Sequence, residues 1–314
     1  MNKFKIQILK GLRKTYQLIL GDTMILNSEC VQDPDVAYKI IFEVLSSDKP
    51  CMIARFGSTE LTCLMNFTGV ENDKNKYMSY LQGKTQPWWW DQKIIDQMQN
   101  WSGFFPPTVE KIEQYCRLML NDIPEVDVLG SWLANENVCK DLLDHAYKVN
   151  LNLLQPWTSK NPWTEAIKGC KVLVIHPFAE SILNQYSIRE KLFTNISVLP
   201  TFKTFTVLKA VQSLGVSDSR FSDWFEALEY MKSEIDKVDY DVCLIGCGAY
   251  GFHLAAHVKR SGKKAVHLGG SLQLLFGIKG MRWDNSGLYN DYWVRPAKSE
   301  FTSNYLNVEN GCYW

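Results

Sequence analysis

Two patterns of apolar and polar residues alternate along the chain. Short continuous apolar runs, which are typical of strands buried on both faces of a parallel sheet, recur between segments whose apolar residues fall at helical spacing. The alternation predicts an α/β fold with a doubly wound, mostly parallel, Rossmann-like sheet of six or seven strands. We expect strands at 51–56, 126–129, 151–154, 171–175, 196–199, 242–245 and 265–268. We expect helices at 33–45, 108–120, 136–145, 182–193, 221–238 and 252–260, with a further helix beginning at 61.

The N-terminal segment, residues 1–30, differs from the rest of the chain. Its positions 1–20 combine basic residues with apolar residues in an amphipathic helical pattern. Arg13 and Lys14 interrupt any signal-peptide core, and no apolar run is long enough to span a bilayer. The helix can lie on an anionic membrane surface or pack against the domain, and both interpretations stay open. We expect the protein in the cytoplasm, where the first interpretation places this helix on the inner face of the membrane.

One α/β domain is expected over 31–290, because no internal repeat or low-complexity linker divides the chain. The region 84–107 predicts an aromatic insertion in that domain. Its adjacent residues Trp88, Trp89 and Trp90 cannot all face a core, so we expect one or two of them to line a groove. Aromatic faces stack on sugars, which makes these three the expected acceptor-binding residues; an aromatic core under a loop is the alternative. The tail, 291–314, is aromatic and weakly periodic, and we expect it to wrap the domain surface.

The amino-acid composition argues against nucleic acid as a partner and against a zinc site. The 34 Lys and Arg residues balance the 34 Asp and Glu residues, so no overall charge attracts nucleic acid. The nine cysteines include no C-x-x-C pair. We therefore expect buried free thiols of a reducing compartment rather than a zinc site.

The clearest motif follows the strand expected at 242–245. Gly246, Gly248 and Gly251 match G-x-G-x-x-G, and a helix and a second strand come after them. In this βαβ context, glycines let the backbone approach a phosphate, and free N–H groups at the helix start favour an anion. A dinucleotide fold usually has a carboxylate at the end of the second strand, where this chain has His267. We expect a nucleotide or nucleotide sugar there rather than NAD; a simple tight turn is the alternative.

Polar residues and glycines follow the carboxyl ends of several expected strands. Because these ends meet at one edge of a parallel sheet, where ligands bind, they predict a single site. Beyond the last strand, Lys279 and Arg282 form a basic turn that can meet phosphate charge. The strand-end segments are 55–60, 132–136, 176–180, 246–251 and 267–270.

The segment at 53–60 resembles a known element. Its sequence, Ile-Ala-Arg-Phe-Gly-Ser-Thr-Glu, is similar to the R-x-G-D-G-E element of bacterial GT-D fold glycosyltransferases, and the glycine-rich βαβ unit resembles the C-terminal half of the same domain. Arg55, Gly57 and Glu60 match the element, whereas Ser58 stands where the family has Asp. The resemblance covers roughly 33–283. It implies transfer of a sugar from a nucleotide-sugar donor to a glycan or lipid-linked acceptor in surface polysaccharide synthesis.

The serine at position 58, where the family has Asp, affects the expected binding of a divalent metal. In the family, the D-x-E carboxylates are associated with a divalent metal, Mn or Mg, near the diphosphate. Only Glu60 of that pair remains, and a serine is a poor substitute for a carboxylate. Three possibilities stay open: weak metal binding at Glu60, recruitment of a second carboxylate, or neutralisation of phosphate by basic side chains. The recruited carboxylate would be Glu180 or Asp284, and the basic residues would be Arg55, Lys279 and Arg282.

We expect an enzyme in which glycine-turn amides and Arg55 stabilise the leaving diphosphate. Glu180 or His176 can take the acceptor proton, although the first can be a helix-terminal carboxylate and the second a core histidine. Glu60 is the expected most sensitive carboxylate. An NAD(P)-dependent oxidoreductase and a non-catalytic carbohydrate-binding relative are the alternatives. The expected donor-binding residues are Arg55, Gly57, Ser58, Gly246, Gly248, Gly251, His267, Lys279 and Arg282.

Overall fold

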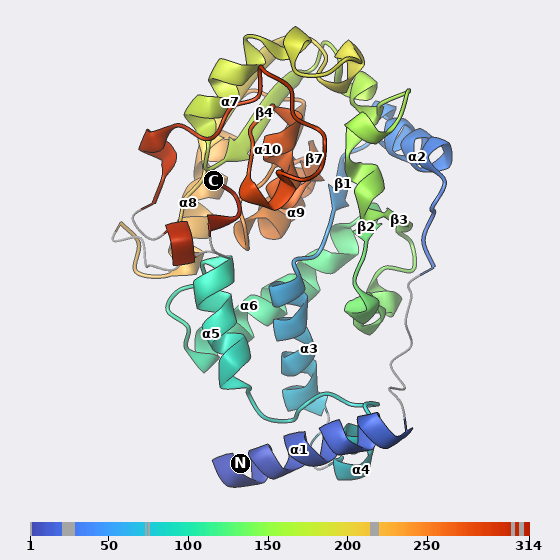
Figure 1. Ribbon diagram of the computed structural model, residues 1–314, viewed down its shortest axis with the longest axis vertical. Helices are drawn as coiled ribbons and strands as arrows, with labels where there is room; N and C mark the ends of the chain where they lie inside the picture. Colours follow the sequence, from blue (N-terminus) through green and yellow to red (C-terminus); the bar gives the residue numbers. More distant parts are fainter. Residues whose placement is uncertain are drawn as a thin grey trace.

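The computed structural model describes residues 2–20, 29–72, 74, 76–213, 220–302, 305–307 and 311–314 of the chain. Its centre is one seven-stranded sheet in which all neighbouring strands are parallel, in the order β3-β2-β1-β7-β6-β4-β5 (Figure 1). The expected α/β, doubly wound, Rossmann-like fold is confirmed. The strands are β1 Cys51–Ala54, β2 Val128–Ser131, β3 Tyr147–Asn150, β4 Lys171–His176, β5 Thr204–Lys209, β6 Val242–Ile245 and β7 Lys264–His267.

Helices cover the sheet and extend beyond it. Several begin at the side-chain cap that the sequence provides: Asp33 accepts a hydrogen bond from the N–H of Val36, and Thr108 from that of Lys111. The α-helices are α1 Lys3–Leu20, α2 Pro34–Ser46, α3 Ser58–Asn72, α4 Tyr77–Leu81, α5 Gln92–Ser102, α6 Val109–Asp122, α7 Ala179–Tyr186, α8 Trp224–Asp236, α9 Tyr250–Arg260 and α10 Leu272–Leu275. The 3-10 helices are Ile123–Glu125, Ala134–Leu142, Leu151–Leu154, Pro156–Thr158, Trp163–Ile167, Arg189–Lys191, Ile196–Val198, Gly269–Ser271, Met281–Trp283, Lys298–Glu300 and Tyr305–Asn307.

The five inner strands of the sheet are buried on both faces, which explains their apolar sequences. Successive side chains of a strand point to opposite faces. Met52 and Ala54 belong to a core shared with α3, α6, α8 and α9, whereas Ile53 belongs to a core shared with α2, α7 and α10. The central strands therefore hold the two helical layers together.

Two expected strands are wrong. The runs at 151–154 and 196–199 form 3-10 helices, and the strands of those regions are β3 and β5. Both runs start after an asparagine whose side chain accepts a backbone N–H, a local hydrogen bond that competes with strand pairing. The strands β3 and β5 form the two edges of the sheet and are only partly buried. They therefore contain polar residues, and the sequence lacks the continuous apolar run that predicts a buried strand.

Two expected helices also differ from the structure. The segment expected as a helix at 136–145 is largely the 3-10 helix Ala134–Leu142. The helix expected at 182–193 begins earlier and ends at Tyr186, after which a 3-10 helix follows. The element types at the centre of the sheet were therefore easier to predict than those at its edges.

A helical extension stands beyond the carboxyl edge of the sheet. The helix α3 leaves β1 and runs to the end of the molecule where α1 and α4 lie, with α5 and α6 beside it (Figure 1). There α1 packs on a cluster that we call the tryptophan cluster, and part of the expected aromatic insertion belongs to it. Residues 21–28 of the segment 1–30 lie outside the described residues. The tryptophan cluster consists of Leu9, Tyr80 and Trp89 with Ile6, Leu81 and Trp88 around them.

Candidate functional site

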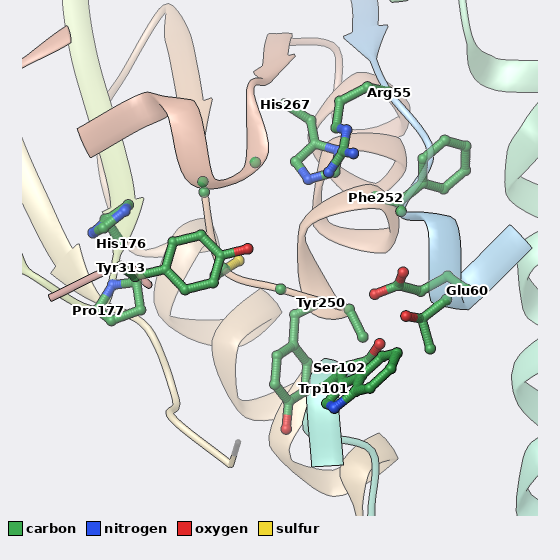
Figure 2. Close-up of a pocket in the computed structure, with 18 of the residues that line it drawn as sticks. Arg55, Glu60, Trp101, Ser102, His176, Pro177, Tyr250, Phe252, His267 and Tyr313 are labelled. Carbon is green, nitrogen blue, oxygen red and sulfur yellow. The ribbon is translucent and has the colours of Figure 1, made fainter. Parts of the chain in front are cut away.

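A cavity of about 190 Å³ lies at the carboxyl edge of the sheet (Figure 2). The loops after β1, β2, β4, β6 and β7 all contribute to its lining, together with the end of α5 and residues near the C-terminal end of the chain. This is the edge at which the sequence predicts a single site. The cavity unites segments from the first strand to the last residues of the chain.

The glycine motif forms one side of the cavity. Gly246 and Gly248 line it, and α9 begins shortly after them at Tyr250. Gly248 has a φ of 57°, a conformation that favours glycine. A Cβ at Gly246 would lie 2.6 Å from the carbonyl oxygen of Gly269, so the loops after β6 and β7 approach closely.

Gly251, the third glycine of the motif, does not line the cavity. A Cβ there would collide with the imidazole of His267, so this glycine lets α9 approach the end of β7. The tight-turn interpretation therefore accounts for part of the motif. At Gly248 the positive φ also fits a tight turn, and the space around it is open, since a Cβ there would meet only the carbonyl oxygen of Ser102 at 3.6 Å.

Arg55 and Glu60 face the cavity from the loop after β1 and the first turn of α3 (Figure 2). Burial lowers the pKa of the Arg55 guanidinium, and the nearby Glu60 carboxylate opposes that change. The guanidinium carbon lies 5.1 Å from the ring centre of Trp132, within cation–π range. Its Nε is buried and has no hydrogen-bond partner among the described residues. The Arg55 side chain lines the cavity, and a cation in that position is suited to an anionic ligand.

Gly57 determines where the Glu60 carboxylate lies. A Cβ at position 57 would collide with that carboxylate, which folds back over the glycine. The absence of a side chain at Gly57 therefore leaves room for the Glu60 carboxylate in this orientation, and a Cβ there would displace it. The sequence resemblance contains both residues, and the structure shows the contact between them.

Two buried histidines lie at the ends of β4 and β7. Burial lowers the pKa of His176 to about 3. Burial, followed by the charge of Arg55, lowers the pKa of His267 to about 3 as well. Both are neutral near pH 7. The backbone N–H of Phe178 donates to Nδ1 of His176 at 3.0 Å, so the other ring nitrogen carries the proton and His176 offers a donor rather than a base. Nδ1 of His267 is buried without a partner in the described part of the chain.

Tyr313 and Arg282 close the cavity from the C-terminal side. Arg282 Nη1 donates to the Tyr313 hydroxyl at 3.1 Å, and its guanidinium carbon lies 4.9 Å from the tyrosine ring centre. Gln273 Nε2 donates to the carbonyl oxygens of Tyr313 and Lys279 and so holds this segment in place. The Tyr313 ring packs over Gly270, where it leaves no room for a Cβ. The tail, which the sequence predicts to wrap the domain surface, therefore also contributes to the site.

Several expected site residues are not in the cavity lining. Glu180 accepts a hydrogen bond from the hydroxyl of Ser299 at 2.8 Å. Lys279 lies over the ring of Tyr289, 5.5 Å from its centre. The carboxylate of Asp284 accepts two hydrogen bonds from Arg295, each at 2.7 Å. The structure does not bring these three side chains to Glu60 or Arg55.

The three adjacent tryptophans also lie outside the cavity lining. Trp89 is only 6% exposed, and the rings of Trp88 and Trp89 meet edge to face with centres 5.0 Å apart. Trp90 is half-buried, and its Nε1 donates to Glu113 at 3.2 Å. The expected exposed aromatic groove is wrong for Trp89, because the packed helix α1 covers it.

The residues present do not fit the divalent metal that the resemblance implies. Among the described lining residues, Glu60 supplies the single carboxylate. No group of three His, Cys, Asp or Glu side chains in the described ranges is placed to hold a metal ion. A hard cation needs several oxygen ligands, and Ser58 brings only a hydroxyl. The positive charge of the cavity lining comes instead from Arg55 and Arg282.

Trp132 and Tyr250 line the cavity and fall inside the expected strand-end segments 132–136 and 246–251, although no role was predicted for either of them. Trp101 and Tyr313 also line the cavity and were not predicted as site residues. Trp132 directly follows β2, so its strand-end position was an available signal. Tyr250 follows the glycines and stacks on Trp224 with ring centres 4.9 Å apart. Trp101 and Tyr313 arrive through tertiary packing, and no local pattern marks them.

Neither a scan against protein-family models nor searches of curated proteins and of solved structures found a match to this chain.

Proposed function

We propose that the protein is a glycosyltransferase that moves a sugar from a nucleotide-sugar donor to a glycan or glycoconjugate acceptor, as in surface polysaccharide synthesis. The observation that carries this proposal is the cavity in which Arg55, Glu60, Arg282 and the glycine loop after β6 meet. A donor of this class combines a diphosphate with a sugar and a base. The cavity offers cations, backbone N–H groups and aromatic rings to those three parts.

The diphosphate is assigned to the side of the cavity that carries the cations. Arg55 lines the cavity with its guanidinium, and the loop at the exposed Gly248 leaves backbone atoms accessible beside the start of α9. Negative charge grows on the diphosphate as it leaves. Hydrogen-bond donors that are already in position therefore stabilise the transition state more than they stabilise the bound nucleotide sugar. Because the carboxylate set does not fit a metal, we assign this role to Arg55 and Arg282.

The acceptor hydroxyl is assigned to Glu60. In the proposed step the acceptor oxygen forms a bond to the anomeric carbon, and the bond from that carbon to the diphosphate oxygen breaks with its electron pair. The hydroxyl proton passes to the Glu60 carboxylate. Trp101 and Trp132, which are 45% and 46% exposed, offer ring faces on which sugars can stack.

The two other candidate functions lack comparable support. A dinucleotide site would use a carboxylate at the end of β7, where the buried His267 stands. A carbohydrate-binding protein without catalysis is favoured by Ser58, which breaks the carboxylate pair of the resemblance. Release of nucleoside diphosphate from the donor separates this candidate from a transferase, because binding alone does not cleave the donor.

The test is a screen of nucleotide sugars for binding and for release of nucleoside diphosphate by the purified protein. We expect Glu60→Gln to lower the rate of release by about a hundredfold, equivalent to about 2.7 kcal/mol of transition-state stabilisation. Glu110→Gln is the matched control: Glu110 is also in the first turn of a helix, but it is exposed on α6 and does not line the cavity. If no nucleotide sugar binds, the proposal fails; binding without release in the wild type assigns the protein to the non-catalytic class.

A second arm addresses the metal. We expect release by the wild type to be unchanged by manganese or by a chelator, and Ser58→Asp to create a measurable affinity for manganese. Inhibition of the wild type by a chelator would contradict the assignment of the diphosphate to the two arginines.

A further inference from the structure

The helix α1 is fixed to the protein by one face. Leu9 is buried in the tryptophan cluster, with Ile6 packed beside it. Arg13 lies over the ring of Tyr80, 4.7 Å from its centre, and Lys10 Nζ lies 2.6 Å from the carboxylate of Asp91. The inner face of the helix therefore has its partners, and the helix is held in a defined orientation.

The opposite face of α1 carries a stripe of large apolar side chains that nothing in the described structure covers. These residues follow one another at helical spacing and range from 46% to 78% exposed. Single exposed apolar residues are ordinary, but a continuous stripe along one helix marks an interaction surface. We call these residues the outer stripe; they are Phe4, Ile8, Leu12, Leu18 and Ile19.

On α1, the charges that flank the outer stripe are all positive. The exposed side chains of Lys5 and Lys14 lie on α1, and the helix contains no Asp or Glu. This asymmetry is local, because Lys and Arg balance Asp and Glu over the whole chain. Next to α1, the short helix α4 adds two more exposed apolar residues, Tyr77 and Met78, which are 50% and 63% exposed. An apolar stripe with basic flanks is complementary to the interface of an anionic bilayer.

We propose that the outer stripe docks the protein on an anionic lipid surface, with α1 lying in the plane of the headgroups. No helix in the described ranges is both long and apolar enough to cross a membrane, so the contact would be peripheral. Figure 1 shows α1 lying across the end of the molecule farthest from the sheet, and α3, whose first residues line the cavity, running towards that end. A lipid contact through α1 would therefore be made at the end of the molecule away from the sheet. This inference is independent of the proposed chemistry.

The experiment is co-sedimentation of the full chain with vesicles of phosphatidylcholine and with vesicles of an equimolar mixture of phosphatidylcholine and phosphatidylglycerol. We expect sedimentation with the anionic vesicles, weakened by added salt, and none with the neutral ones. Leu12→Glu should reduce partitioning by about tenfold or more, because it removes apolar contact and adds repulsion. The double variant Lys5→Glu and Lys14→Glu should also reduce partitioning to the anionic vesicles.

The matched control is Leu183→Glu. Leu183 lies in α7 and is 47% exposed, close to the 50% of Leu12, but it is remote from α1. It should leave vesicle binding unchanged, and equal melting temperatures would exclude a folding defect in either variant. The proposal is overturned if the wild type sediments with neither vesicle, or equally with both. It is also overturned if Leu12→Glu dissociates a dimer without affecting vesicles, since a second copy would then cover the stripe.

Discussion

Two groups of aromatic side chains in this molecule have different surroundings. In the tryptophan cluster, Trp89 is 6% exposed and meets Trp88 and Tyr80 edge to face, with ring centres 5.0 and 5.1 Å away. At the cavity, Trp101 and Trp132 are about half exposed and share the lining with Arg55 and Glu60. The comparison shows that adjacency in the sequence does not predict exposure: the adjacent rings of Trp88 and Trp89 pack against each other, whereas Trp132, beside a strand end and near the guanidinium of Arg55, stays half exposed.

The largest expected effect is a loss of folding stability in acid, and its source is two buried histidines that line the cavity. The pKa values of His176 and His267 are about 3, below the ordinary value of 6.5, so the unfolded chain takes up protons that the folded chain does not. Stability present at neutral pH is therefore lost as the pH falls from 6.5 towards 3. At pH 5 the loss is about 2 kcal/mol for each histidine and about 4 kcal/mol for both. Denaturant titrations at pH 7 and pH 5 measure it, and imidazole NMR signals that titrate near pH 6.5 would contradict it.

Trp89→Ala should reduce the stability of the protein by about 3 kcal/mol, since it empties the centre of the tryptophan cluster. The affinity for an acceptor glycan, measured by calorimetry below the melting temperature of the variant, should stay at the wild-type value. A weakened affinity with unchanged stability would return Trp89 to the ligand surface that its sequence context predicts.

Gly57→Ala tests the contact that positions Glu60. The backbone at position 57 tolerates alanine, but the added Cβ would displace the Glu60 carboxylate. We expect donor turnover to fall about thirtyfold, equivalent to about 2 kcal/mol, with little change in melting temperature. In a Glu60→Gln background the same substitution should add little, because both changes act on one group. Additive losses would mean that Gly57 acts independently of Glu60.

Trp101→Ala should have the smallest effect of the four predictions. Unlike Trp89→Ala, it should weaken ligand binding and leave the stability of the protein nearly unchanged. Its half-exposed ring contributes little to the core, so stability should change little. Loss of a stacking surface should weaken binding of the sugar-containing ligand by about 1 kcal/mol, measured by calorimetry. Binding of the free nucleoside diphosphate serves as the control and should be less affected.

The central part of the fold could be predicted from the sequence because physical constraints coincide there. Strands buried on both faces must be apolar throughout, and the loops at their carboxyl ends carry glycines and polar residues. The positions of Arg55, Glu60, Gly248 and His267 follow from this rule. The edge strands β3 and β5 are only partly buried, which removes the signal, and apolar 3-10 segments beside them imitate strands.

The rest of the site depends on contacts between distant parts of the chain. The side chains of Glu180 and Asp284 have the expected chemistry, but Ser299 and Arg295 engage them elsewhere. Their partners could not be inferred from local patterns. Tyr313 enters the cavity because the buried Gln273 holds the backbone of its segment, a relation between two residues far apart in the sequence.

The arrangement of Tyr313 over Gly270 has a kinetic consequence. The walls of the cavity join residues as far apart in the chain as Arg55 and Tyr313, and contacts of such long sequence separation have a large entropic cost during folding. The parallel strands up to β7 can pair before the segment beyond α10 reaches its place. In a refolding experiment, recovery of the far-ultraviolet circular dichroism should therefore precede recovery of nucleotide binding, and the site would be among the last parts of the native structure to form.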